Sequence, residues 1–528
     1  MKAVFSDSQS VEKEAKARYA FPEFVMMENA AAAMEAEVLK AICRDESDST
    51  HASAPCPRVL IICGSGNNGG DGYALARRLC GKIPCDIFAI KAPKTEEAIA
   101  QRKMAESTGV PIFTEIPADE KLSSYSVIVD CILGTGFSGE LKEPLAGIIE
   151  KVNSLPAYKL ACDIPTGLHF NADLTITMGC LKTALFGDQA KDLCGTIQVA
   201  DLGITPAKFE ACGRPDAFLI EKDDIKLPWR KNKASHKGSY GHTAVFAGEK
   251  SGAGILAASA ALNFGSGLVT LVKTENSNLE QFKISPELMI NDEIPANTTC
   301  VLIGSGLGGV STLTASPARE VPPAPAQKAL DQVKAWFSRA KAPACVFDAD
   351  LFSWKELPAF LDELGNSRPE GKIILTPHLK ELKSFCDFAF PGEAPVTIAE
   401  LTQAEKRIEI GKKICQRFPG ITLIMKSANT FIAAREGGTA SIKGTTVSTE
   451  EGTSNVQVCI CDAGAPSLAK AGSGDVLAGM TAALLAQDYT ARDAAITAVY
   501  AHALAGSSFA NGEDWGLTAE KLINRLGK

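Results

Sequence analysis

The feature that most constrains the fold is a glycine-rich segment between an apolar run and a helical pattern. Residues 58–63 (RVLIIC) are short, apolar and rich in β-branched side chains, residues 64–72 (GSGNNGGDG) are rich in glycine, and residues 73–80 have a helical pattern. A strand, a glycine-rich loop and a helix in this order predict one βα unit of a parallel sheet. The loop then lies at the carboxyl end of the strand, where such sheets bind ligands.

The same alternation continues through the first half of the chain. Residues 126–131 (SVIVDC) and 159–163 (KLACD) are apolar runs with an aspartate at or near the end, and residues 197–204 are the last predicted strand. Right-handed crossovers place the loops that follow these strands along one edge of the sheet. The first half is therefore predicted to be a parallel sheet with helices on its faces.

The second half contains further apolar runs but is not a repeat of the first. Predicted strands occupy residues 243–247, 268–272, 301–303, 345–348, 373–375 and 421–425, and predicted helices occupy 252–264 and 475–485. This pattern predicts a second α/β unit. Three other stretches are interpreted as a linker (215–239), a surface loop (315–327) and a long hairpin or insertion (438–455).

Composition narrows the class of function. The 528 residues carry a net charge of −8, with 22% charged and 45% hydrophobic residues, which suits a globular protein of about two to four domains. The negative charge argues against nucleic-acid binding through a basic surface, although backbone N–H groups can still hold anionic ligands. Many of the sixteen cysteines lie in apolar runs, which predicts buried reduced thiols; examples are Cys63, Cys131, Cys162 and Cys345. The six histidines lack the spacing of a zinc site.

The beginning of the chain does not read as a targeting segment. Residues 1–20 are polar and charged and lack the apolar centre of a signal peptide. No apolar run reaches the length of about 18 residues that a membrane span needs. We therefore expect no membrane partner and a cytoplasmic location.

Two glycine loops and two aspartates are predicted at the carboxyl edge of the first sheet. Asp130 precedes the short loop at 134–136 (GTG), and Asp163 begins DIPTG at 163–167. Glycines let the backbone approach a phosphate closely, and a helix N-terminus directs N–H donors at it. Taken singly, a glycine loop could be a tight turn and a strand-end aspartate a helix cap. Their convergence on one edge favours an anion site with carboxylates beside it.

The order of these motifs resembles the YjeF N-terminal family of NAD(P)H-hydrate repair enzymes, over roughly residues 8–206. The motifs that carry the resemblance are MENA at 27–30, GNNGGDG at 66–72, Asp130 with its GTG, and DIPTG at 163–167. One position departs from the family, because Ala31 stands where glycine is usual. The resemblance implies an epimerase that interconverts the two C6 epimers of hydrated NAD(P)H.

The resemblance also implies roles for individual residues. Asn68, Asp130 and Thr166 would be ligands of a potassium ion, and Asp163 would be the acid–base residue. A carboxylate suits this chemistry, because inversion at the hydroxyl-bearing carbon needs a group that shuttles a proton. The residues that would hold the hydrated dinucleotide are Asn67, Asn68, Gly69, Gly70, Asp71, Gly134, Thr135, Gly136, Phe137, Ser138, Gly139, Glu140 and Asp163.

The sharpest motif of the second half is AGSGDVLAG at 471–479, in which glycines and a serine precede Asp475 at a predicted helix start. Backbone N–H groups, the helix dipole and a carboxylate side by side would form an anion hole. The alternative is a capped helix with a flexible entry. The Gly-Ser-Gly-Asp order resembles the ribokinase-like superfamily, whose members use this aspartate as a base toward a substrate hydroxyl.

Further segments resemble the ADP-dependent NAD(P)H-hydrate dehydratases, from residue 235 to nearly the C-terminus. They are HKGSYG at 236–241, GSGLVT at 265–270, PELM at 286–289, GSGLG at 304–308, DAD at 348–350 and TPH at 376–378. The resemblance implies that four residues contact the hydrated nucleotide: Ala253, Gly306, His378 and Asp475. The residues that would contact ADP are Lys426, Ser427, Ala428, Asn429, Thr430 and Gly474.

Some of these positions admit another interpretation. His378 could be a partly buried structural histidine, and Asp348 and Asp350 could equally be turn caps, so both aspartates are left out of the predicted site. The family's Lys-Gly-x-Gly-Thr loop has lost both glycines at 426–430. If a positive φ is required there, Asn429 can adopt it at modest cost but Ala428 cannot easily.

The implied dehydratase chemistry is similar to that of a kinase. Phosphoryl transfer from ADP to the C6 hydroxyl creates a leaving group, and its elimination restores NAD(P)H and yields AMP and phosphate. The resemblance therefore implies ADP as co-substrate. It also implies Mg²⁺, held mainly by the phosphates of the nucleotide.

We therefore predict a bifunctional, homo-oligomeric α/β enzyme. Its parts would be a Rossmann-like, three-layer epimerase domain at 1–215, a linker at 216–234 and a ribokinase-like dehydratase domain at 235–528. One alternative is a ribokinase-like small-molecule kinase fused to a nucleotide-binding module. Another is a first domain that binds ligand without catalysis. Both motif sets in one chain argue against the former, and Asp163 with an intact glycine loop argues against the latter.

Overall fold

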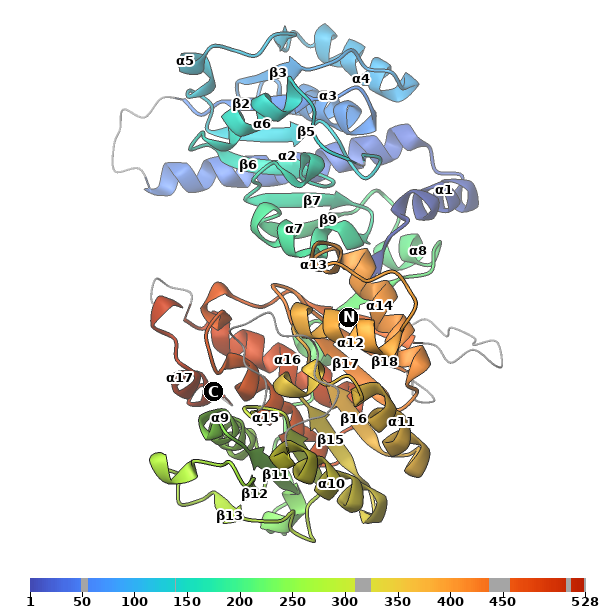
Figure 1. Cartoon of the computed structure of the whole chain (residues 1–528). Helices are drawn as coiled ribbons and strands as arrows, with labels where there is room; N and C mark the ends of the chain where they lie inside the picture. The colour runs from blue at the N-terminus through green and yellow to red at the C-terminus, as the bar shows by residue number, and fades with distance from the viewer. Residues whose placement is uncertain (49–55, 138, 309–323, 436–455, 510–513, 527–528) are drawn as a thin grey trace. The chain divides into compact units, whose positions relative to one another are not determined.

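The computed structural model describes residues 1–48, 56–137, 139–308, 324–435, 456–509 and 514–526 (Figure 1). The chain forms two compact units. One consists of Ala3–Asp216, called the N-terminal unit, and the other of Met1–Lys2 with Ala217–Lys528, called the C-terminal unit. The predicted α/β class is confirmed in both units, and the parallel sheet predicted for the first half is confirmed in the N-terminal unit.

The N-terminal unit is built on a seven-stranded sheet in which every neighbouring pair is parallel. In sheet order its strands are β4 (Ile112–Phe113), β3 (Cys85–Ala89), β2 (Val59–Cys63), β5 (Val127–Cys131), β6 (Tyr158–Cys162), β7 (Leu174–Met178) and β9 (Thr196–Ala200). Its helices are α1 (Ser8–Tyr19), α2 (Glu23–Asp48), α3 (Asn67–Leu79), α4 (Glu96–Ser107), α5 (Asp119–Leu122), α6 (Leu145–Asn153), α7 (Asp188–Leu193) and α8 (Pro206–Glu210).

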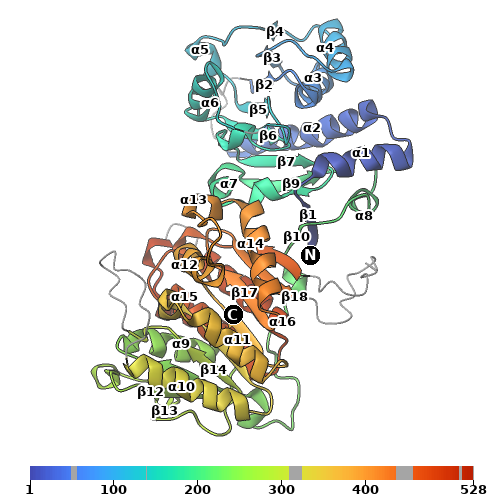
Figure 2. The same ribbon diagram turned by 45° about the vertical axis from the view of Figure 1, so that its right-hand side comes forward.

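Alternate residues of β2 show that this sheet is buried on both faces. Val59 and Ile61 pack in a cluster with residues of α2 and α3, whereas Leu60 and Ile62 pack in a second cluster with residues of α6. Successive side chains of a strand point to opposite faces of the sheet. Helices therefore cover both faces (Figure 2). The predicted three-layer arrangement is confirmed.

The glycine-rich segment is partly helical, which differs from the prediction. Helix α3 begins at Asn67, six positions before the predicted start at residue 73. Glycines are tolerated in its first turn because the backbones approach closely there. A Cβ on Gly69 would lie 2.1 Å from the Gly64 carbonyl oxygen, and one on Gly64 would lie 2.0 Å from that of Ile132. The glycines therefore seat the start of α3 against the loop after β5.

The C-terminal unit carries a larger sheet, parallel except where β18 pairs with β17 and β19. In sheet order its strands are β13 (Met289–Asn291), β12 (Leu268–Lys273), β11 (His242–Ala247), β14 (Cys300–Ile303), β15 (Ala344–Phe347), β16 (Lys372–Leu375), β17 (Ile421–Met425), β18 (Thr430–Arg435), β19 (Val456–Cys461) and β10 (Ala217–Leu219). Its helices are α9 (Ser251–Asn263), α10 (Ala324–Arg339), α11 (Leu357–Ser367), α12 (Leu379–Ala389), α13 (Ile398–Leu401), α14 (Ala404–Arg417), α15 (Ser473–Ala486), α16 (Ala491–Ser507) and α17 (Ala519–Ile523).

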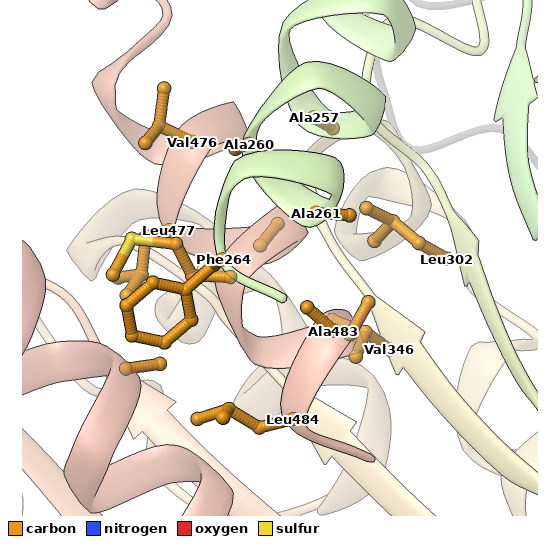
Figure 3. Close-up of a cluster of buried hydrophobic side chains, with 14 of the residues drawn as sticks. Ala257, Ala260, Ala261, Phe264, Leu302, Val346, Val476, Leu477, Ala483 and Leu484 are labelled. Carbon is orange, nitrogen blue, oxygen red and sulfur yellow. The ribbon is translucent and has the colours of Figure 1, made fainter. Parts of the chain in front are cut away.

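Small residues let α9 and α15 pack closely in the core of this unit. Figure 3 shows Ala257, Ala260 and Ala261 of α9 beside the side chains of α15. A Cβ on Gly479 would lie 2.1 Å from the Ala257 carbonyl oxygen, so only glycine fits there. Ala257 is fully buried. This contact explains the small-residue helix that was predicted at 252–264.

Three predicted segments differ from the structure or lie outside it. The stretch interpreted as a linker contains β10, which pairs with β19 through Phe218 and Cys459. Residues 324–327 of the predicted surface loop belong to α10, and residues 315–323 lie outside the described residues. The predicted hairpin or insertion at 438–455 also lies outside them. The last predicted strand of the first half is confirmed but ends at Ala200.

Two whole-chain expectations can be compared with the structure. The four cysteines predicted to be buried have no exposed surface, and all four are free thiols: Cys63, Cys131, Cys162 and Cys345. Across the described residues, we find no helix whose length and apolar character would allow it to traverse a bilayer.

Candidate functional sites

A cavity of about 550 Å³ opens at the carboxyl edge of the N-terminal sheet. Most of the predicted residues line it: Asn67, Asn68, Asp71, Gly134, Thr135, Gly136, Phe137 and Asp163. Four others do not. Gly69 and Gly70 are buried in α3, and Gly139 and Glu140 are exposed outside the cavity lining. Ser138 lies outside the described residues.

Asp163 is held in an unusual backbone conformation at this cavity. Its φ is 74°, in the left-handed region that costs a non-glycine residue energy. Its side chain is fixed by two backbone donors, because Thr135 N lies 3.2 Å from Oδ2 and Met178 N lies 3.3 Å from Oδ1. Strained residues that are held so firmly cluster at functional sites.

Lys182 is the residue of this site that sequence reasoning missed. Its Nζ lies 2.6 Å from Asp163 Oδ1, and both side chains are almost fully buried at the cavity. The ammonium also donates to Thr177 Oγ1 at 2.8 Å and to the Met178 carbonyl oxygen at 2.9 Å. Lys182 ends β8 (Leu181–Lys182). Its sequence signal is a single lysine inside an apolar run, which is rare unless the charge is paired.

Asp130 and Thr166 form a second buried group beside the cavity. Thr166 donates to Asp130 through its backbone N, at 2.8 Å, and its hydroxyl, at 2.7 Å. Ile132 N lies 3.1 Å from the same carboxylate. Burial raises the pKa of Asp130 to about 6, against these hydrogen bonds. Among the described residues no cationic side chain pairs with it, so an oxygen-bound cation would suit the group.

Asn68 lines the cavity. Its Nδ2 donates to the Cys162 carbonyl oxygen at 3.2 Å. A Cβ on Gly134 would lie within 2.8 Å of Asn68 and of Asp163 Oδ2, so glycine is required where the two side chains approach the loop. The two predicted ligands Asp130 and Thr166 are thus in contact, and Asn68 lies near Asp163.

Asp71 faces the same cavity from the first turns of α3. It is 7% exposed, and burial followed by the charge of Asp163 raises its pKa well above the ordinary value. The Cys162 thiol donates to Asp71 Oδ2 at 3.7 Å. Asp71 and Asp163 are therefore two carboxylates with different surroundings in one cavity.

In the C-terminal unit, the Gly-Ser-Gly-Asp motif forms the N-terminus of α15. Gly472 is the N-cap with a φ of 88°, a conformation that glycine adopts without strain. Ser473 is supported from α16 by His502, whose Nε2 lies 3.0 Å from the Ser473 carbonyl oxygen. Burial lowers the pKa of His502 to about 4, so the neutral ring can donate this bond. The backbone N–H groups of this first turn have no intrahelical acceptor, as at every helix N-terminus.

Asp475 follows in that first turn. Burial, and then the charge of Asp348, raises its pKa to about 6. A carboxylate with a pKa near neutrality can take a proton at physiological pH while remaining largely ionised. This is the environment expected of a general base.

Asp348 was interpreted as a possible turn cap, and that interpretation is wrong. It precedes a short 3₁₀ helix but makes no capping hydrogen bond from its side chain. Its Oδ1 instead accepts from Thr376 Oγ1 at 2.6 Å and pairs with Lys426 Nζ at 2.8 Å. Its Oδ2 accepts from Ser305 Oγ at 3.0 Å. Sequence reasoning could not find this group, because its four members lie far apart in the chain.

His378 is exposed, unlike the partly buried histidine of the alternative interpretation, but it does have a structural role. It is the N-cap of α12, where Nδ1 accepts from Glu381 N at 3.2 Å and Nε2 lies 3.1 Å from Glu381 Oε1. Burial and then Lys426 lower the pKa of His378. Gly306 and Ala253 lie together, because a Cβ on Gly306 would be 3.0 Å from that of Ala253. The predicted contact set thus falls on α9, α12, α15 and the loop after β14.

The loop at 426–430 connects β17 to β18 without the two glycines of the family pattern. Neither Ala428 nor Asn429 has a positive φ, so this bend does not need glycine. Arg407, fully buried on α14, supports it by donating to the Asn429 carbonyl oxygen at 2.7 Å. The altered sequence therefore suits the backbone, and Lys426 stays at the start of the loop.

Comparison with known proteins bears on both units. Residues 23–184 match the family described as the YjeF-related protein N-terminus, and residues 243–528 match the NAD(P)H-hydrate dehydratase family. A bifunctional NAD(P)H-hydrate repair enzyme of Helicobacter pylori is 36% identical, over 100% of this chain and 99% of its own length. One of Escherichia coli is 28% identical, over 85% and 80%.

One solved structure is also similar to this chain. It is an ADP/ATP-dependent NAD(P)H-hydrate dehydratase from Bacillus subtilis, co-crystallised with ATP and Mg²⁺, at 22% identity and a TM-score of 0.42. It covers 59% of this chain and 96% of its own. The full-length identity and the two matched families together show that the chain belongs to the family of bifunctional NAD(P)H-hydrate repair enzymes.

Proposed function

We propose that the N-terminal unit interconverts the R and S epimers of hydrated NAD(P)H and that the C-terminal unit dehydrates the S epimer at the expense of ADP. The observation that carries this proposal is a buried or half-buried aspartate beside a glycine-rich backbone in each unit. Family membership supplies the substrate class. The homo-oligomeric state and the cytoplasmic location stay predictions, which sedimentation and cell fractionation would test.

In the epimerase cavity, Asp163 is the proposed acid–base group. The C6 carbon of the hydrate bears a hydroxyl and the ring nitrogen, so it can invert by ring opening and reclosure. An ionised carboxylate accepts the hydroxyl proton as the C6–N bond breaks and delivers it to the ring nitrogen. Reclosure on the other face reverses the transfer. The Lys182 ion pair and the two backbone donors support this role, because they fix the carboxylate at the cavity.

The glycine-rich start of α3 and the loop at 134–136 would hold the dinucleotide. Backbone N–H groups at a helix N-terminus favour phosphate oxygens. Asn68, Asp130 and Thr166 are the proposed ligands of K⁺. The donor chemistry fits, since all three offer oxygen atoms and Asp130 is a buried carboxylate with no cationic partner among the described residues. A bound cation would fix these loops and offset phosphate charge.

In the dehydratase site, Asp475 is the proposed base toward the C6 hydroxyl. The C6 hydroxyl gives its proton to Asp475, and the C6 hydroxyl oxygen accepts the terminal phosphoryl group of ADP. AMP is released in this step. Loss of phosphate from C6 and a proton from the neighbouring ring carbon then restores NAD(P)H. The backbone N–H groups of residues 472–474 would stabilise charge on the transferring phosphoryl group.

We expect most ligands of Mg²⁺ to be phosphate oxygens of the nucleotide and not protein side chains. No group of three His, Cys, Asp or Glu side chains suited to a metal ion occurs in the part of the chain that the structure describes. Mg²⁺ commonly keeps phosphate and water ligands in such sites. Ala253, Gly306 and His378 would contact the hydrate, and Gly474 with residues 426–430 would contact ADP.

The direct test uses purified (S)-NADPH hydrate. The full-length protein is mixed with hydrate and Mg²⁺, ADP or ATP is added in separate reactions, and absorbance at 340 nm follows the return of NADPH. We expect recovery with ADP. Recovery with ATP alone would contradict the assignment of the donor, and no recovery with either nucleotide would contradict the dehydratase function.

A further inference from the structure

We propose that Asp348 is a positioning residue of the dehydratase site: it holds the Lys426 ammonium beside the N-terminus of α15, where the phosphoryl group of ADP would be transferred. This inference rests on the proposed function. It assigns a role to a carboxylate that never meets the substrate: Asp348 positions Lys426 and adds its own charge to the surroundings of Asp475.

The geometry of the sheet brings the group together. Four neighbouring strands, β14, β15, β16 and β17, run parallel in that order. Each contributes one member from the segment that follows its carboxyl end: Ser305, Asp348, Thr376 and Lys426. The Asp348 carboxylate contacts all three of the others: it accepts hydrogen bonds from Ser305 and Thr376 and forms an ion pair with Lys426. Such convergence at a sheet edge is the usual origin of α/β active sites.

Asp348 is too deeply buried to bind a ligand itself. It is 1% exposed, whereas the Lys426 side chain is 18% exposed and reaches the site. A Cβ placed on Gly474 would lie 3.5 Å from Lys426 Nζ. The ammonium is therefore held against the first turn of α15, adjacent to Asp475. A fixed cation at that point can offset the charge of a phosphoryl group in transfer.

The same pair sets the electrostatics of the base. Burial favours the neutral form of Lys426, but the charges of Asp348 and Glu381 raise its pKa and keep it a cation. For Asp475, Asp348 raises the pKa after burial and Lys426 lowers it. The other titratable groups around Asp475 and Lys426 are Asp350 after β15, His378 and Glu381 on α12, and His502 on α16. Removing Asp348 or Lys426 should therefore shift the acid limb of activity in opposite directions.

The test measures kcat/KM for ADP between pH 5 and 8 in full-length Asp348→Asn and Lys426→Met proteins. For Asp348→Asn we expect kcat/KM for ADP to fall about tenfold or more, with the KM for hydrate unchanged. Its acid limb should move by about half a pH unit to lower pH, because Asp475 loses a neighbouring negative charge. In Lys426→Met the limb should move to higher pH. The double variant should be no slower than Lys426→Met.

A matched control is Asp86→Asn in the N-terminal unit. Asp86 is 2% exposed, pairs with Arg58 at 2.9 Å and accepts from the Tyr125 hydroxyl at 2.6 Å, so it resembles Asp348 in burial and partners. Its replacement should leave the pH profile of dehydration unchanged. A shift equal to that of Asp348→Asn would mean that loss of any buried ion pair suffices, and would overturn the proposal.

Other outcomes are equally decisive. Losses that multiply in the double variant would show that Asp348 does not act through Lys426. An unchanged pH limb in Asp348→Asn would show that its charge does not influence Asp475, and either result would overturn the proposal. If circular dichroism shows that Asp348→Asn does not fold, Lys426→Met carries the test, and an unmoved limb in it overturns the proposal. Failure of the unsubstituted protein to convert hydrate with ADP would instead contradict the proposed function.

Discussion

Both units place an aspartate beside the carboxyl ends of parallel strands, but the two aspartates have different nearest charges. Asp163 is bound directly by the Lys182 ammonium at 2.6 Å. Among the described residues Asp475 has no such direct ion pair, because the nearby Lys426 is bound to a second carboxylate, Asp348. Burial and Asp348 together raise the pKa of Asp475 to about 6.

The difference teaches that the position in the fold does not by itself decide the electrostatic surroundings of a carboxylate. Asp163 has a cation bound directly to it, whereas the cation near Asp475 is bound to another carboxylate. Asp163 is fixed as a member of a buried pair and presents one oxygen edge to the cavity. Asp475 is left to exchange a proton near neutral pH. The same residue type can therefore serve two reactions in one chain.

Replacing Asp163 should have the largest effect, because it removes the proposed acid–base group of the epimerase. Asp163→Asn keeps the shape of the side chain but removes its charge, so exchange between the two epimers should fall by about 10⁴-fold. Dehydration of the purified S epimer should be unaffected. Epimer exchange is followed by chromatography of the R and S hydrates. Exchange at the original rate would remove Asp163 from the mechanism.

Replacing Asp475 tests the aspartate of the C-terminal unit, and the rate of dehydration should fall about a thousandfold. Asp475→Asn should still bind nucleotide, because the backbone N–H groups of the first turn of α15 remain. Calorimetry with ADP measures the binding, and absorbance at 340 nm measures turnover. Retained turnover would refute the role of this residue as the base.

Removing Lys182 tests whether the direct ion pair matters. Lys182→Met leaves the buried Asp163 charge unpaired, so the free energy of unfolding should fall by about 3 kcal/mol, measured in urea, and epimer exchange should slow. A matched control is Lys159→Met. Lys159 is also buried in the N-terminal unit, but its ammonium donates to the carbonyl oxygens of Leu155 and Ala157 and is outside the cavity lining. Equal effects of the two substitutions on epimer exchange would contradict the account.

The rate of dehydration should also depend on pH, and this effect is smaller than those of the substitutions. The pKa of Asp475 is raised from 3.8 to about 6, so its carboxylate form is lost as the pH falls through 6. Dehydration at pH 5 should therefore be about tenfold slower than its plateau. Circular dichroism at each pH checks that the protein stays folded. A plateau that continues down to pH 5 would contradict the raised pKa.

The sequence was sufficient for the parts of the fold that local pattern determines. The apolar runs and glycine-rich loops predicted the parallel sheet of the N-terminal unit and the α/β class of the C-terminal unit. The aspartates at the strand ends predicted Asp163 at the cavity. The predicted start of α3 was wrong because glycines are typical of loops. Their role in a helix start follows only from the close contact with the segment after β5. Strand β10 was missed because three residues cannot reveal a partner strand more than 200 positions away.

The missing residues of the sites have one cause in common. Lys182 and Asp348 become meaningful only through partners that lie far away in sequence, Asp163 and Lys426. Their burial, which makes an ion pair necessary, is also a property of the folded chain. The lost glycines at 426–430 raised a doubt that the structure answers, since neither Ala428 nor Asn429 has a positive φ.

The most direct test of a two-site repair enzyme starts from a mixture of both epimers of NADPH hydrate, with ADP, Mg²⁺ and K⁺ present. Absorbance at 340 nm is followed to completion under conditions in which spontaneous epimerisation is slow. The account predicts full recovery of NADPH, because the N-terminal unit converts the R epimer into the S epimer that the C-terminal unit consumes. A plateau at the share of the S epimer would contradict an active epimerase in this chain.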